Sequence, residues 1–88
     1  MRVGQARKRD ANENVIVEAL EHIGIVVMKI SGEGCPDLLC YSRGSWLAVE
    51  VKMPGGSLTT AQIAARSLAP YPVVESVADA LSLFGVRA

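Results

Sequence analysis

The chain has 88 residues, of which half are hydrophobic, and nine basic residues balance nine acidic ones. This length allows a single domain, and a net charge of zero gives no overall electrostatic argument for nucleic acid binding. Two cysteines and one histidine are too few for a four-ligand structural zinc site. No signal peptide or membrane-spanning run is recognisable, so we expect a reduced, cytoplasmic protein without a membrane partner.

Hydrophobic periodicity and turn residues predict seven elements in the order α-β-β-β-α-β-α, an α/β fold. They are a helix over 11–23, strands over 25–30, 37–42 and 46–52, a helix over 59–68, a strand over 71–75 and a helix over 76–84. Asp10 or Asn12 is available to cap the first helix, and Gly24 to end it. The β-branched residues of 25–30 favour a buried strand.

The N-terminal segment is basic. Residues 1–10 are expected to form an arm ahead of a domain over 11–88, with four of the nine cations at Arg2, Arg7, Lys8 and Arg9. Such an arm can follow a DNA backbone, although many basic termini are simply solvated.

Glu50 and Lys52 lie two positions apart in an otherwise apolar strand, so both side chains point to the same face. Val49 and Val51 then point to the other face and suit a core. One interpretation is an edge strand with an ion pair in solvent. The other is a central strand whose charged side chains are used in chemistry.

Pairing the strands across a turn at Gly44 brings Asp37 opposite Glu50, or within two positions of it. Two close carboxylates repel each other unless a cation lies between them, and Mg²⁺ prefers oxygen ligands while keeping several waters. We therefore expect Asp37, Glu50 and the Val51 carbonyl to bind a divalent ion. Lys52 would orient the attacking water or stabilise charge on a phosphate, which indicates phosphodiester hydrolysis.

Two further residues are candidates for this site. Glu13 lies on the apolar side of the first helix, where a carboxylate is costly unless it is paired or near a metal; alternatively it is a helix-start acid. Gln62 follows Thr59 by three residues, which predicts a capping box, although its helix could also lean over the metal.

Together these residues resemble the PD-(D/E)XK nuclease superfamily, and more closely its virus-type replication-repair nuclease (VRR-NUC) domain in the stand-alone phage form. The motifs are Glu13, then Gly34-Cys-Pro-Asp37, Glu50-Val-Lys52, and Gln62 after a Gly-Gly-x-Leu-Thr segment. The likeness runs over nearly the whole chain. The first predicted helix of the chain is also similar to that of Holliday-junction resolvases.

The resemblance implies a mixed sheet flanked by helices, dependence on Mg²⁺ or Mn²⁺, and cleavage of branched DNA in a bacterial or phage-infected cell. Asp37 and Glu50 would bind the metal, Lys52 would be catalytic, and Glu13 would act through a water. Gln62 would be the added family glutamine. The balanced charge departs from the strong positive charge usual in junction resolvases.

The expected function is resolution of four-way junctions by a homodimer. There are two alternatives: a nickase or flap nuclease of the same superfamily, and a module that binds DNA without cutting it. The dimer is expected because so short a chain cannot bury its apolar surplus efficiently; a tightly packed monomer is the other possibility. Interface candidates in the last helix are Val77, Leu81 and Phe84.

Overall fold

The computed structural model describes residues 10–86, so Arg2, Arg7, Lys8 and Arg9 of the predicted basic arm lie outside the described residues. The predicted order of elements is confirmed. The elements are α1 (Glu13–His22), β1 (Val26–Lys29), β2 (Leu38–Ser42), β3 (Ser45–Val51), α2 (Thr60–Leu68), β4 (Val73–Val74) and α3 (Val77–Leu83). Within residues 10–86, no helix is long and apolar enough to span a membrane.

The four strands form one mixed sheet in the order β1-β2-β3-β4. β1 pairs with β2 and β2 with β3 in antiparallel fashion, whereas β3 and β4 are parallel. The protein is therefore an α/β fold with a four-stranded sheet and three helices in its described part. β3 is an inner strand, so the interpretation of Glu50 and Lys52 as an ion pair on an edge strand is wrong.

A two-residue turn joins β2 to β3. Arg43 and Gly44 both have positive φ angles, 53° and 81°, the combination found in type I′ hairpin turns, whose twist matches that of the strands. Ser45, predicted to belong to the turn, is the first residue of β3. The turn sets the register and places Leu38 opposite Val49.

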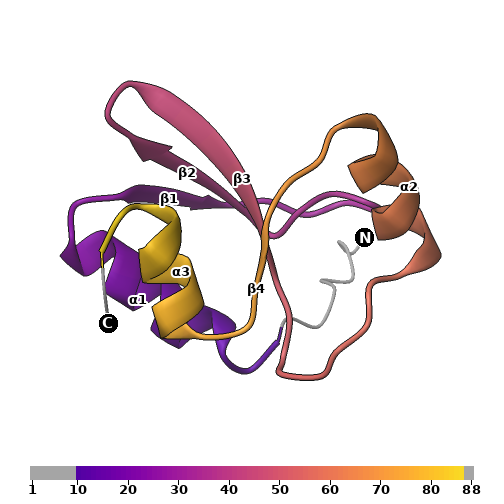
Figure 1. The fold of residues 1–88 in the computed structure, drawn as a ribbon, viewed down its shortest axis with the longest axis horizontal. Helices are drawn as coiled ribbons and strands as arrows, with labels where there is room; N and C mark the ends of the chain where they lie inside the picture. The colour runs from indigo at the N-terminus through magenta and orange to yellow at the C-terminus, as the bar shows by residue number, and fades with distance from the viewer. Residues whose placement is uncertain (1–9, 87–88) are drawn as a thin grey trace, which may run out of the picture.

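One face of the sheet carries the hydrophobic core. Helices α1 and α3 lie together on this face, while α2 lies apart from them at the other end of the molecule (Figure 1). The fully buried core side chains include Ile16, Leu20, Leu38, Val49 and Val51. Cys40 is also in this core, and burial raises the pKa of its thiol to about 11, so it stays protonated and unreactive at neutral pH.

The opposite face of the sheet is left uncovered at the β2–β3 hairpin end. Val26, Tyr41 and Trp46 lie in register there, and Met28 lies beside them. These four side chains, which we call the apolar patch, are exposed, Val26 by 54% and Trp46 by 52%. The prediction of a buried strand over 25–30 is wrong, because β1 is an edge strand and no described helix covers this end of the face.

The last helix completes the core. Val77, Leu81 and Phe84 are partly buried and pack against the core cluster, so part of their apolar surface is used inside the subunit, and their role at a subunit interface stays a prediction. In so small a domain, α3 is needed to cover the sheet beside α1, and its apolar side chains are used inside the subunit. Large apolar side chains stay exposed on the sheet, in the apolar patch, and also on the helices, where Val15, Ile63 and Leu68 are exposed.

Candidate active site

Asp37 and Glu50 face each other at the end of the β2–β3 ladder. Leu38 pairs with Val49, so continuing the register by one residue places Asp37 opposite Glu50 on the same sheet face. Both side chains are buried, with exposed fractions of 7% and 1%. Asp37 Oδ2 accepts a hydrogen bond from the Val51 amide at 2.9 Å. The two residues form the carboxylate pair predicted from the sequence.

Lys52 lies against this pair. Its Nζ is 3.6 Å from Glu50 Oε2, and its side chain is only 16% exposed. Its backbone is fixed by the hydrogen bond from the Lys52 amide to the Val74 carbonyl, 2.9 Å. The ammonium group offsets part of the repulsion between the two carboxylates. The structure thus brings Asp37, Glu50 and Lys52 together, as the sequence predicted.

Gln62 makes the predicted capping box and also contacts Glu50. Its backbone amide donates to Thr59 Oγ1 at 3.1 Å and its Oε1 accepts from the Thr59 amide at 2.9 Å, which makes a complete capping box at the start of α2. Its Nε2 donates to Glu50 Oε2 at 2.8 Å, and the side chain is buried. The capping box therefore orients the side-chain amide of Gln62, which donates to the Glu50 carboxylate.

The loop before Asp37 packs closely on α2. Gly34 has a φ of 78°, and a Cβ at this position would lie 3.1 Å from the Ala61 carbonyl oxygen. A larger residue would push the loop from the helix. The Asp37 carbonyl accepts from the Ile30 amide at 2.9 Å, which anchors the end of the loop beside β1. The Gly-Cys-Pro-Asp motif thus positions Asp37 through backbone contacts.

Glu13 is buried in the first turn of α1, as its place in the apolar stripe predicted, whereas Glu18 and Glu21 are exposed. Its Oε2 lies 4.0 Å from Lys29 Nζ on β1. Residues 10–86 contain no group of three or more His, Cys, Asp or Glu side chains placed to share an ion. The action of Glu13 through a water remains a prediction.

Asn12 connects the start of α1 to the site through hydrogen bonds that the sequence did not indicate. Asn12 occupies the N-cap position but makes no side-chain capping bond. Its Nδ2 instead donates to the carbonyls of Lys52, at 3.1 Å, and Glu75, at 3.0 Å. The expected capping role of Asn12 is wrong. Nothing local distinguishes such a long-range contact from an ordinary cap.

Tyr71 is a second residue that sequence reasoning missed. It is buried two residues before β4. Arg66 on α2 holds it, because Arg66 Nε donates to the Tyr71 carbonyl at 3.0 Å and the guanidinium carbon lies 5.7 Å from the ring centroid. Burial raises the pKa of Tyr71, and the charge of Glu50 raises it further, whereas Arg66 lowers it. Tyr71 is therefore a neutral phenol at physiological pH.

The donors at the carboxylate pair suit a hard divalent ion. Asp37 and Glu50 supply oxygen atoms from adjacent strands, and Mg²⁺ or Mn²⁺ sites of this kind need few protein ligands because water completes the coordination. Within a strand, the N–H and C=O of one residue point to the same side. The Val51 amide points to Asp37, so the Val51 carbonyl is directed to the same side and fits the ligand set.

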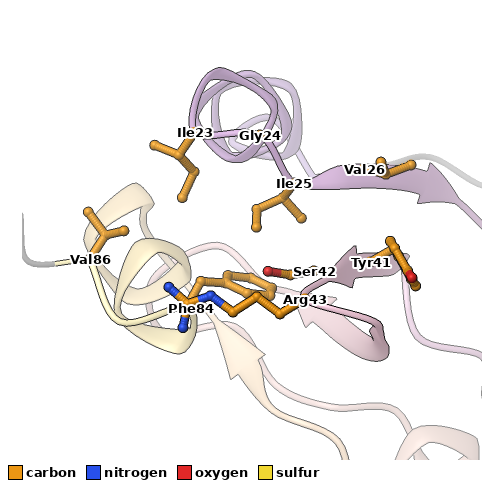
Figure 2. Close-up of a pocket in the computed structure, with 9 residues that line it drawn as sticks. All are labelled: Ile23, Gly24, Ile25, Val26, Tyr41, Ser42, Arg43, Phe84 and Val86. Carbon is orange, nitrogen blue, oxygen red and sulfur yellow. The ribbon is translucent and has the colours of Figure 1, made fainter.

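A cavity of about 420 Å³ lies at the opposite end of the molecule, between the end of α1, the tip of the β2–β3 hairpin and the C-terminal turn (Figure 2). Its walls include Ile23, Ile25, Val26, Arg43 and Phe84. It contains none of the predicted site residues and no carboxylate. The chemistry expected from the sequence therefore concentrates at the carboxylate pair.

Comparison with known proteins gives no match: no family model, curated protein or solved structure matches the chain.

Proposed function

We propose that this protein is a divalent-metal-dependent DNA endonuclease. The observation that carries the proposal is the burial of Asp37 and Glu50 side by side with Lys52 Nζ 3.6 Å from Glu50. Burying charged groups is costly, and such an arrangement is most often kept for function. The element order and mixed sheet are also compatible with the proposed PD-(D/E)XK core of the VRR-NUC type.

The proposed reaction is hydrolysis of a phosphodiester. The oxygen of a water molecule bonds to phosphorus, one ester P–O bond breaks, and the leaving oxygen takes up a proton. Mg²⁺ or Mn²⁺, held by Asp37, Glu50 and the Val51 carbonyl, would supply positive charge against the phosphate. Lys52 would orient the attacking water or stabilise the charge that develops on the phosphate oxygens.

Other residues would keep these groups in position. Gln62 fixes the orientation of the Glu50 carboxylate through its hydrogen bond at 2.8 Å. Asn12 ties the start of α1 to the carbonyl of Lys52. Glu13, in the adjoining turn, would act through a water. A site supported in this way is held near its working geometry before the substrate binds.

We further propose that the protein is a homodimer that prefers four-way junctions, and that the apolar patch is its interface. The patch carries no charged side chain, so a two-fold axis can place it against its own copy without bringing like charges together. Tyr41 and Trp46, with ring centroids 4.9 Å apart, are aromatic residues of the type that anchors interfaces. The patch and the carboxylate pair share one sheet face, so both sites would lie at the margin of a single interface.

A cleavage panel tests this function. Linear duplex, nicked, flap and four-way DNA are incubated with the full chain in Mg²⁺, in Mn²⁺ and in EDTA. Cleavage of the junction in either metal, lost in EDTA, is the expected result. Preferential cutting of flaps or nicked duplex would move the assignment to another specificity of the same chemistry. Junction binding without cleavage in any metal would instead make the protein a DNA-binding module.

A further inference from the structure

Tyr71 lies beside the carboxylate pair although it is distant from both residues in the sequence. The Glu50 amide donates to the Pro72 carbonyl at 3.0 Å, and Glu50 pairs with Val73 in the parallel ladder. Side chains two positions apart along an extended backbone project to the same face, so Tyr71 is placed on the face that carries Glu50. Helix α2 covers it there through Arg66.

The Tyr71 hydroxyl is buried without a hydrogen-bond partner among the described residues. The whole residue is only 7% exposed, so bulk water does not readily satisfy this group. Its ring is held by Arg66, and the charges of both Glu50 and Asp37 act on the hydroxyl. A buried polar group that lacks a partner is costly, and its persistence beside a polar site indicates that a ligand supplies the partner.

We propose that Tyr71 is a further ligand-binding residue of this site, whose hydroxyl donates a hydrogen bond to an oxygen atom bound at the carboxylate pair. This inference rests on the proposed function for the position of the ligand. The oxygen belongs either to a hydration water of the cation or to a phosphate group of DNA. Both are strong acceptors, and a neutral phenol is a suitable donor for either.

The first test is Tyr71→Phe, which removes the hydroxyl and keeps the ring. Without ligand, the unfolding temperature of the variant should be unchanged or raised, because no protein hydrogen bond is lost. Ligand stabilisation should be weaker, measured by thermal unfolding with Ca²⁺ alone and with Ca²⁺ plus four-way DNA. We expect apparent affinity to fall about fivefold. Ser82→Ala, which removes an exposed hydroxyl on α3, is the control and should change neither value.

The two ligand conditions, Ca²⁺ alone and Ca²⁺ with four-way DNA, identify the acceptor of the Tyr71 hydroxyl. Weaker binding of Ca²⁺ alone assigns the hydroxyl to a hydration water, whereas weaker binding only when DNA is present assigns it to a phosphate oxygen. If neither affinity changes, the inference is wrong. It is also wrong if the unfolding temperature of ligand-free Tyr71→Phe drops by about 4 °C or more, since the hydroxyl then has a structural role.

A second measurement locates the cation without relying on any variant. In protein with ¹³C-labelled tyrosine rings, substoichiometric Mn²⁺ should broaden the Tyr71 resonances and leave those of Tyr41 sharp. Equal broadening of both, or broadening of Tyr41 alone, would overturn the placement. These results are separable from cleavage: an inactive wild-type protein with the expected Tyr71 behaviour refutes the nuclease only, and an active one with an inert Tyr71 refutes this inference only.

Discussion

The sheet face that carries Asp37 and Glu50 has two ends of opposite character. At one end the charged side chains of Glu50 and Lys52 are buried or nearly so, and Gln62 of α2 donates a hydrogen bond to Glu50. At the other end Met28 and Trp46 stand about half exposed. This reverses the usual distribution, in which apolar side chains are covered and charged ones are solvated.

On the proposed function, each end of this face would meet a different partner. Buried carboxylates are kept where chemistry or a cation uses them, whereas an exposed group of large apolar side chains is typical of a protein interface. On the opposite sheet face, α1 and α3 cover the valine and leucine side chains. Substitutions at the two ends of this face would therefore separate the proposed catalysis from the proposed assembly.

The largest effect is expected for Glu50→Gln at the polar end. Loss of the carboxylate should slow single-turnover cleavage by about 1000-fold, because both a metal ligand and the partner of Lys52 are changed. The unfolding temperature should stay the same or rise, since repulsion from Asp37 is relieved. Asp37→Asn should behave alike. Glu18→Gln, on the exposed side of α1, is the control; an equal loss of activity there, or full wild-type activity in excess EDTA, would contradict the assignment.

Lys52→Ala should slow the chemical step by about 100-fold, the scale of losing one positioned electrostatic group. DNA affinity should change little, because Lys52 is mostly buried and directed to Glu50. Single-turnover rates at saturating enzyme, together with filter binding in Ca²⁺, separate the two quantities. Arg43→Gln, which removes an exposed cation in the hairpin turn, serves as control. Collapse of binding with a normal rate for bound DNA would reduce Lys52 to a phosphate contact.

At the apolar end, Trp46→Glu should weaken self-association by about 30-fold, because a buried aromatic anchor is lost and two like charges meet across the two-fold axis. Light scattering at micromolar concentration measures this change. Val15→Glu is the matched control, since Val15 is 57% exposed on the outer side of α1. A wild-type protein that is monomeric at these concentrations would refute the interface, while leaving the carboxylate site untouched.

The smallest effect is expected for Gln62→Glu, which keeps the acceptor of the capping box but replaces the donor to Glu50 by a third carboxylate. Cleavage should fall about tenfold, and the unfolding temperature should also fall, because the third buried carboxylate adds repulsion to the pair. Thr59→Ala is the complementary variant: it should cost about 1 kcal/mol of unfolding free energy while the rate stays near wild type. If Thr59→Ala slows cleavage as much as Gln62→Glu, the capping box alone explains Gln62.

Local sequence patterns were sufficient to predict much of this structure. The element order, the hairpin at Gly44 and the burial of Glu13 follow from periodicity and turn chemistry, which depend on near neighbours in the chain. The meeting of Asp37, Glu50 and Lys52 also follows, because a two-residue turn and the alternation of a strand fix the register.

Long-range packing decided the rest. The parallel pairing of β3 with β4 brings Tyr71 to Glu50 and lets Asn12 reach the Lys52 carbonyl, and no local spacing records either contact. The same packing makes β1 an exposed edge strand although its sequence suits a core, and draws Phe84 of the last helix onto the core cluster. Hydrophobicity determines that a side chain favours burial, but only the arrangement of the helices around the sheet determines which side chains are covered.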